Sequence, residues 1–213
     1  MTPQEGCRET ARICQLAPVI SVLTINSSGK AGRLANALVS GGLPVLEVTL
    51  RTPAALDAIR AMTKVKGSVI GAGTVLAASD VRAAKDAGAV FGVSPGATEQ
   101  LLGAAEAEDF PIIPGSATAS EAMRLLERGY TVQKFFPAEA SGGAAALKAL
   151  AAPLPQIKFC PTGGINMGNV RDYLDLENTI CVGGSWVAPA DLVSGGRWNE
   201  IEALAQKAAS LRN

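Results

Sequence analysis

The sequence predicts a single α/β domain built as a (β/α)8 barrel, and three observations lead to this prediction. Eight short apolar or β-branched runs recur along the 213 residues. Their centres are roughly 20 to 26 residues apart, which suits one strand, one helix and two loops. Helical patterns lie between the runs. Polar residues fall mostly at the carboxyl ends of the runs, which in a barrel meet at one mouth, where the active site lies.

The predicted strands are almost continuously apolar, as expected of parallel strands that are buried on both faces. Strict alternation of strand and helix argues for a parallel sheet covered by helices. An open, doubly wound sheet is the alternative architecture, although eight units are long for it. The predicted strands cover 19–25, 45–50, 68–73, 90–94, 112–115, 131–136, 157–162 and 179–184.

The segments between these strands place apolar residues at three- and four-residue spacing, which is typical of helices that pack on a sheet. Thr52 is expected to cap one helix. Thr118 or Ser120 is expected to cap another, which carries Glu121 in its first turn. A helix precedes the first strand, and a closing helix is expected at 198–211.

The composition fits one domain over residues 1–213, with 48% hydrophobic residues. The 19 basic and 19 acidic side chains cancel, and no basic cluster stands out. Nucleic acid and anionic membrane surfaces are therefore not expected partners. No stretch approaches the ~18 apolar residues that span a bilayer, and the first residues lack the layout of a signal peptide. We therefore expect a cytoplasmic protein.

The chain contains no histidine. This excludes catalysis by Ser-His-Asp or Cys-His sets and zinc sites built on histidine. The four cysteines show no pair spacing typical of a metal site. Cys160 and Cys181 lie in apolar strand-like runs, where a free cysteine usually acts as a small buried hydrophobe. Proton transfer must therefore use Glu, Asp, Lys, Tyr, Cys or water.

The sixth predicted strand carries a lysine, Lys134, on the same face as Val132 and Phe136. Burying an ammonium is costly unless it is paired. A desolvated lysine retains free amine near neutral pH, and this amine can condense with a ketone to form an iminium, an electron sink for carbon–carbon cleavage. The alternative is a lysine whose ammonium reaches solvent along its aliphatic stem.

The second predicted strand places Glu47, Thr49 and Arg51 on one face. A carboxylate enclosed by apolar neighbours is rarely left unpaired in a core. Near Lys134, Glu47 could shuttle protons, a role that histidine usually has. Arg51 lies nearer the mouth and offers a planar fork suited to a substrate carboxylate. The alternatives are a structural ion pair between Glu47 and Arg51 and a helix-capping role for the loop.

Paired glycines lie at the ends of the last two predicted strands: Gly163-Gly164 follows the seventh, and Gly183-Gly184 ends the eighth, just before Ser185. Glycine pairs leave backbone N–H groups free to approach an anion, and barrels of this kind commonly bind phosphate in these two loops. The sequence therefore predicts a phosphate site there. It shows no dinucleotide fingerprint with its following acidic residue, so a nicotinamide cofactor is not expected.

Together these motifs resemble the 2-keto-3-deoxy-6-phosphogluconate (KDPG) aldolase family, whose members often also act on 4-hydroxy-2-oxoglutarate. The resemblance runs from about residue 18 to the C-terminus. It rests on the ordered segments VLEVTLRTPAALDAI, GAGTVL, SPG, IPG, KFFPAEASGG, FCPTGGI and GGSW. The chain departs from many relatives at Ser21, where they carry a proline, and at Ser116, where a β-branched residue is more usual.

The resemblance implies a class I aldolase on a TIM barrel that cleaves KDPG to pyruvate and glyceraldehyde 3-phosphate. Lys134 would be the Schiff-base residue and Glu47 the general acid/base. The resemblance also implies a homotrimer and no metal requirement. The implied pyruvate-binding residues are Arg51, Thr74, Pro95, Phe136 and Thr162, and the implied phosphate-binding residues are Gly163, Gly164 and Ser185.

Three alternatives remain open at the level of the sequence. The same chemistry could act on 4-hydroxy-2-oxoglutarate or on the galactonate epimer of the substrate. A sugar-phosphate isomerase or epimerase would bind a similar molecule without covalent catalysis. A catalytically silent phosphate-binding barrel would be stabilised by ligand but would show no turnover.

Overall fold

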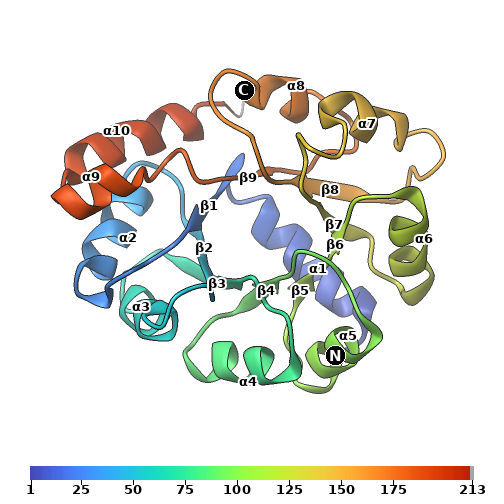
Figure 1. Ribbon diagram of the computed structural model, residues 1–213, viewed down its shortest axis with the longest axis horizontal. Helices are drawn as coiled ribbons and strands as arrows, with labels where there is room; N and C mark the ends of the chain where they lie inside the picture. Colours follow the sequence, from blue (N-terminus) through green and yellow to red (C-terminus); the bar gives the residue numbers. More distant parts are fainter. Residues whose placement is uncertain (212–213) are drawn as a thin grey trace.

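The structure, a computed structural model, describes residues 1–211 and confirms the predicted (β/α)8 barrel. A closed ring of parallel strands is surrounded by helices (Figure 1). The strands are β1 (Val19–Leu23), β2 (Val45–Thr49), β3 (Val69–Gly73), β4 (Phe91–Val93), β5 (Ile112–Ile113), β6 (Gly115–Ser116), β7 (Val132–Phe135), β8 (Lys158–Pro161) and β9 (Val182–Gly184).

One helix precedes β1, and the other helices follow strands and cover the outside of the ring, which is why the strands are apolar on both faces. They are α1 (Pro3–Cys14), the 3-10 turn η1 (Ser28–Lys30), α2 (Ala31–Ser40), α3 (Ala55–Met62), α4 (Ala78–Asp86), α5 (Glu99–Ala107), α6 (Ala119–Arg128), α7 (Gly143–Ala149), α8 (Val170–Leu174), α9 (Ala190–Gly195) and α10 (Trp198–Ala209).

The ring has two irregular joints. The fifth predicted strand divides at Pro114, which has no N–H to donate, so β5 pairs with β4 and β6 pairs with β7. The eighth predicted strand, 179–184, is shorter than expected, because only Val182–Gly184 pairs regularly with β1. It joins β8 through the single bridges Phe159–Thr179 and Thr162–Gly183.

Two hydrophobic clusters correspond to the two faces of the strands. One lies between the strands and the outer helices and includes Leu34, Leu38 and Ile59. The other fills the lower barrel interior, where Ile13 and Cys14 of α1 pack against side chains of the strands. Helix α1 therefore closes the barrel at the amino ends of the strands (Figure 1). The opposite end is left for the active site.

Cys160 and Cys181 are buried in the interior cluster, as the sequence predicts. Hydrogen bonding to Cys14 and Cys160, together with burial, raises the pKa of the Cys181 thiol. A thiol held neutral in this way packs as a small hydrophobe.

Two helix starts test the predicted caps. Thr118 caps α6 and forms a reciprocal capping box with Glu121, which confirms that prediction. The predicted cap at Thr52 is wrong, because α3 begins at Ala55 and its N-cap position is Ala54. The hydroxyl of Thr52 instead donates to the carbonyl of Ile25, which ties the loop after β2 to the loop after β1.

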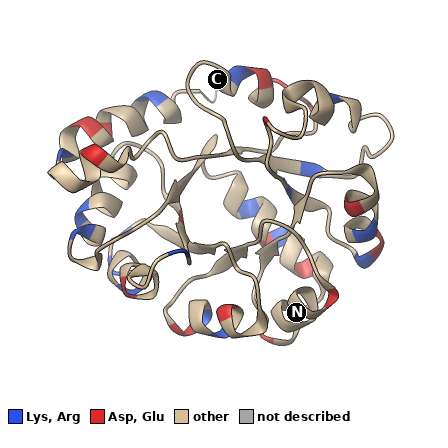
Figure 2. Cartoon of the chain, in the orientation of Figure 1, with Lys and Arg blue, Asp and Glu red and all other residues tan. Residues whose placement is uncertain are grey.

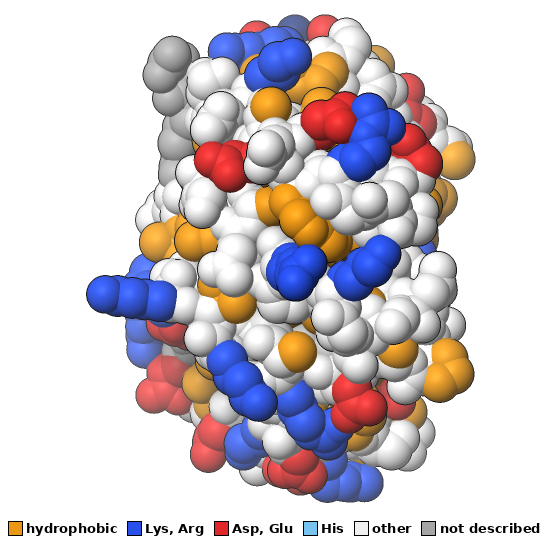
Figure 3. Space-filling view, turned by 90° about the vertical axis from the view of Figure 1, so that its left-hand side faces the viewer, with side chains coloured by type: hydrophobic (Ala, Val, Ile, Leu, Met, Phe, Trp, Pro, Cys, Tyr) orange, Lys and Arg blue, Asp and Glu red, His pale blue; other side chains and the backbone are white. Residues whose placement is uncertain are grey.

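Charged residues lie mostly on the outer helices (Figure 2). Acidic and basic side chains are interspersed with small hydrophobic patches on the face that contains α2, α9 and α10 (Figure 3). Within residues 1–211, no helix has both the length and the apolar composition needed to cross a membrane.

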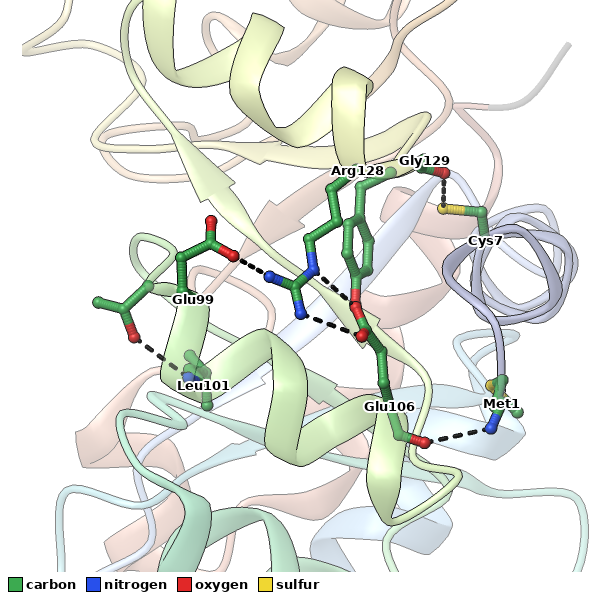
Figure 4. A network of polar contacts seen from close by, with 9 residues as sticks. Met1, Cys7, Glu99, Leu101, Glu106, Arg128 and Gly129 are labelled. Atoms are coloured by element: carbon green, nitrogen blue, oxygen red, sulfur yellow. Dashed lines mark hydrogen bonds and ion pairs between the residues drawn. The ribbon is translucent and has the colours of Figure 1, made fainter.

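A partly buried ionic network ties α5 and α6 to the N-terminus (Figure 4). Arg128 donates two parallel hydrogen bonds to Glu106, with Nε–Oε1 and Nη2–Oε2 distances of 2.8 and 3.0 Å, and a further one to Glu99. Tyr130 donates to Glu106 at 3.1 Å, and the terminal ammonium of Met1 donates to the Glu106 carbonyl. The hydrogen bond from Arg128 is the main cause that lowers the pKa of Glu106.

This network predicts a pH-dependent contribution to stability. A carboxyl with a lowered folded-state pKa stabilises the fold above its unfolded pKa, and this stability is lost as the pH falls through the folded value. Glu106→Gln should therefore cost about 1 kcal/mol at pH 7 and progressively less below pH ~4.5. Urea denaturation of both proteins from pH 7 to pH 4 measures the difference. Asp57→Asn, at an exposed ion pair with Arg60, is the control and should change little. A difference for Glu106→Gln that is constant with pH would contradict the prediction.

Candidate active site

Lys134 and Glu47 meet inside the barrel. Lys134 lies on β7 and Glu47 on β2, and the distance from Lys134 Nζ to Glu47 Oε1 is 3.8 Å. Their side chains are 4% and 3% exposed. The pairing proposed from the sequence is therefore confirmed in space, and the alternative in which Lys134 extends into solvent is contradicted.

The two side chains of the pair are not joined by a hydrogen bond. Within residues 1–211, Glu47 Oε1 makes no hydrogen bond, and the ring of Phe136 lies 4.9 Å from Lys134 Nζ. Burying two charges costs several kcal/mol each, which their attraction offsets only in good geometry. A buried pair separated by more than a hydrogen-bond length is a poor stabilising device. It is suited to transferring a proton to a molecule placed beside it.

Gly73 at the end of β3 provides the space that Glu47 occupies. A Cβ at residue 73 would lie 2.2 Å from Glu47 Oε1 and 2.7 Å from its Cγ. Gly73 is the last residue of β3 and pairs in register with Thr49 on β2, two residues after Glu47. Any side chain there would therefore displace the carboxylate. Strand alternation does not predict this role of Gly73, although the motif GAGT contains the residue.

Gly73→Ala should accordingly lower kcat/KM by about a hundredfold, because displacing a catalytic group by an ångström has an effect of this order. Steady-state kinetics with circular dichroism as a fold check measures it. Gly32→Ala is the matched control, since a Cβ at that position in α2 would meet nothing within 4 Å. A folded Gly73→Ala protein with wild-type activity would contradict this use of the glycine.

Arg51 and Thr74 lie together at the mouth. Arg51 Nε donates to Thr74 Oγ1 at 3.0 Å. Thr74 has φ +58°, a left-handed conformation that costs about 1–3 kcal/mol for residues other than glycine. Such residues are often found at functional sites. Arg51 therefore pairs with Thr74 and Glu47 with Lys134, and the structural Glu47–Arg51 ion pair considered from the sequence is contradicted. Thr49, between them, is buried and donates to the Leu23 carbonyl.

Thr162 lies at the end of β8, where its amide donates to the Phe135 carbonyl at 3.0 Å. Gly183 leaves room for it, because a Cβ there would lie 2.3 Å from Thr162 Oγ1. Pro95 follows β4, and its backbone lies close to Gly115. A Cβ on Gly115 would lie 2.3 Å from the carbonyl carbon and oxygen of Pro95. The implied pyruvate-binding residues are thus all at the carboxyl ends of strands.

Gly163, Gly164 and Ser185 also lie at this end of the barrel. Gly163 and Gly164 have φ values of +104° and +83°, which side chains rarely adopt. The bridge between Thr162 and Gly183 places their loop beside the loop that carries Ser185. Gly164 and Ser185 are exposed. The two loops predicted to bind phosphate are therefore neighbours in space.

The two sequence departures lie elsewhere on the strands. Ser21 is buried in β1, and its hydroxyl has no partner within residues 1–211. Ser116 on β6 donates to Gln133 Oε1 at 2.9 Å, and Gln133 in turn donates to the carbonyls of Ala122 and Tyr130. This buried polar set anchors α6 to the barrel wall.

A cavity of about 630 Å³ opens on one side of the mouth, between β1 and η1–α2 on one wall and the segment after β9 on the other. It borders Ser185 but neither Lys134 nor Glu47. The cavity is therefore separate from the buried Lys134–Glu47 pair. The cavity residues include Thr24, Ile25, Lys30, Leu34, Ser185 and Trp186.

Within the described chain, no cluster of three or more Cys, Asp or Glu side chains is arranged to hold a metal ion. A (β/α)8 barrel with a buried lysine beside a carboxylate has the architecture of a barrel aldolase. Residues 10–204 match the model of the KDPG and KHG aldolases, and the chain belongs to this family of carbon–carbon lyases.

Individual relatives agree with this assignment over nearly the whole chain. The 2-dehydro-3-deoxy-phosphogluconate aldolase of Pseudoalteromonas atlantica is 51% identical over 91% of this chain and 90% of its own. The KDPG aldolase of Zymomonas mobilis, solved with 3-phosphoglycerate, is 46% identical with a TM-score of 0.92, covering 97% of this chain and 98% of that one. The Legionella pneumophila KDPG aldolase, with pyruvate captured as a covalent carbinolamine, is 44% identical with a TM-score of 0.91, covering 93% and 97%.

Proposed function

We propose that this protein cleaves KDPG to pyruvate and glyceraldehyde 3-phosphate through a Schiff base on Lys134. The observation that carries the proposal is the buried Lys134–Glu47 pair at the mouth of the barrel. A related KDPG aldolase has been captured with covalently bound pyruvate, which supports covalent chemistry in the family. The isomerase and silent-barrel alternatives do not account for membership in an aldolase family.

The reaction begins when Glu47 takes a proton from the ammonium of Lys134, and the resulting amine attacks the C2 ketone to form a carbinolamine. Glu47 supplies the proton that lets hydroxide leave as water, which yields the iminium. Glu47 then removes the proton of the C4 hydroxyl, the C3–C4 bond breaks, and its electrons pass to the iminium to form an enamine. Glyceraldehyde 3-phosphate leaves. The enamine is protonated at C3, and water hydrolyses the resulting iminium to pyruvate and free Lys134.

The other side chains at the mouth hold the substrate in place. Arg51 and Thr74 bind the C1 carboxylate, because a guanidinium fork and a hydroxyl at 3.0 Å from each other can bind the same anion. Pro95, Phe136 and Thr162 enclose the pyruvyl group. Gly163, Gly164 and Ser185 bind the phosphate through backbone N–H groups and a hydroxyl. This arrangement requires no metal, because the iminium accepts the electrons of the broken bond.

The test is intact mass measurement after incubation with pyruvate and sodium borohydride, followed by peptide mapping. We expect a reduced pyruvyl adduct on Lys134 and on no other lysine. An adduct at another lysine, or none at all, would overturn the Schiff-base assignment while leaving the fold intact.

The family description also includes KHG aldolases, so 4-hydroxy-2-oxoglutarate is a second candidate substrate. A coupled assay of pyruvate release with KDPG, its galactonate epimer and 4-hydroxy-2-oxoglutarate would rank the three. We expect the highest kcat/KM for KDPG, because the turn at Gly163 and Gly164 and the hydroxyl of Ser185 suit its phosphate. We further propose a homotrimer, which light scattering after size-exclusion chromatography would show as three chain masses.

A further inference from the structure

Three consecutive carbonyls after β8 are held by hydrogen bonds. The Thr162 carbonyl accepts from the Ala138 amide at 2.8 Å, and the Gly163 carbonyl accepts from the Glu139 amide at 3.1 Å. The Gly164 carbonyl accepts from the side-chain amides of two asparagines, at 3.2 Å from Asn169 and 3.4 Å from Asn166. The carbonyls of this turn are therefore all directed at protein donors.

A trans peptide is planar, so its N–H points opposite to its carbonyl. The N–H groups of Gly163, Gly164 and Ile165 must therefore point away from the donors that hold the carbonyls. Across residues 1–211, none of these three N–H groups donates to a protein acceptor. Successive free N–H groups in a turn of this kind form an anion-binding concavity.

Glu139 is the residue that fixes this turn from the neighbouring loop, after β7. Its amide holds the Gly163 carbonyl, and its side chain lies across Gly164, where a Cβ would be 2.5 Å from Glu139 Cγ. Glu139 is exposed, yet its carboxylate accepts a hydrogen bond from the hydroxyl of Tyr173 on α8. Burial, followed by the hydrogen bond to Glu139, raises the pKa of Tyr173, so its hydroxyl stays a donor.

We propose that Glu139 and Tyr173 are positioning residues for the phosphate group of the substrate. This inference rests on the proposed binding of phosphate at Gly163 and Gly164. Tyr173, fully buried beneath the loops, holds the carboxylate of Glu139 in one place. Glu139 then fixes the glycine turn so that the N–H groups of the turn face outward. Because Tyr173 holds the Glu139 carboxylate, this negative charge does not move toward the bound anion.

The proposal predicts an effect on binding without an effect on the imine chemistry. Tyr173→Phe, which keeps the ring and loses the hydroxyl, should raise KM for KDPG on the order of tenfold and change kcat less than about twofold. Exchange of the pyruvate methyl protons with deuterated solvent uses the enamine but no phosphate, and should keep its wild-type rate. The inhibition constant of inorganic phosphate against KDPG should rise in parallel with KM.

Two further variants distinguish the effect of the Tyr173–Glu139 hydrogen bond from the effect of the Glu139 charge and from a general effect on the fold. Glu139→Gln keeps an oxygen that can accept from Tyr173, so it should leave KM for KDPG near or below the wild-type value. Tyr130→Phe is the matched control, because Tyr130 is the other tyrosine of the chain and also donates to a carboxylate, that of Glu106, at 3.1 Å. It should leave both kinetic constants unchanged.

Ser185→Ala distinguishes failure of this inference from failure of the phosphate site. If Ser185→Ala raises KM for KDPG but Tyr173→Phe does not, the phosphate site stands and the positioning role is overturned. If neither variant raises KM and inorganic phosphate does not compete with KDPG, both are overturned. A fall in pyruvate exchange that matches the loss of KDPG cleavage in Tyr173→Phe would indicate a merely structural role and overturn the inference. A KM for Glu139→Gln as high as that of Tyr173→Phe would do the same.

Discussion

Lys134→Arg is expected to abolish cleavage. Arginine keeps a positive charge in contact with Glu47, but its guanidinium stays protonated and cannot form an iminium. Without the iminium, the electrons of the C3–C4 bond have no acceptor, and we expect kcat to fall by at least about 10⁵-fold. The borohydride adduct with pyruvate should disappear together with turnover. Kinetics and intact mass on the same preparation measure both losses.

The matched control is Lys158→Arg. Lys158 lies on β8, the neighbour of β7, but its side chain is exposed and donates to the Glu177 carbonyl at 2.8 Å. This variant should retain full activity and the adduct. Turnover preserved in Lys134→Arg would refute the covalent mechanism, and thermal unfolding of the variant shows that any loss does not come from a broken fold.

Glu47→Gln should lower kcat by about 10²–10⁴-fold, the usual effect of removing a general acid/base. Glutamine has nearly the same shape and still fits beside Gly73, but it cannot carry the proton from the C4 hydroxyl. The variant also leaves Lys134 buried without a counter-ion, which should lower the free energy of unfolding. Stopped-flow cleavage and pyruvate methyl exchange measure the two proton transfers that depend on the carboxylate.

Borohydride trapping of the pyruvate adduct distinguishes the role of Glu47 from that of Lys134. During long incubation, Glu47→Gln should still accumulate the reduced pyruvyl adduct, since the nucleophile is intact, whereas Lys134→Arg should not. Glu202→Gln, on the outer helix α10, serves as a carboxylate control and should behave as wild type. A kcat for Glu47→Gln within tenfold of wild type would assign the proton transfers to another group or to water.

Periodicity predicted the fold well because each strand is buried on both faces and each helix on one, a pattern that local sequence records directly. The two irregular joints of the barrel could not be predicted from the sequence in this way. Pro114 divides the fifth strand between two neighbours, and the last strand is short because 179–181 joins β8 through an isolated bridge. Which neighbour a strand pairs with depends on residues far away in the chain.

The candidate site shows the same division. Alternation along single strands indicated Lys134 and Glu47, since a charged residue in an apolar strand is costly without a partner. Alternation could not decide whether Glu47 pairs with Lys134 or Arg51, because both lie on compatible faces. The closed barrel decides it, because it places Lys134 Nζ of β7 at 3.8 Å from Glu47 Oε1 of β2.

The sequence by itself therefore determined the order of strands and helices, the end of the barrel that carries the chemistry, and the family resemblance. Only the tertiary structure decided how groups from separate units meet: Gly73 giving space to Glu47, Arg51 pairing with Thr74, and Tyr173 holding Glu139 over the glycine turn. The physical reason is that hydrophobic burial follows a local period, whereas a contact between side chains depends on the closure of the whole ring.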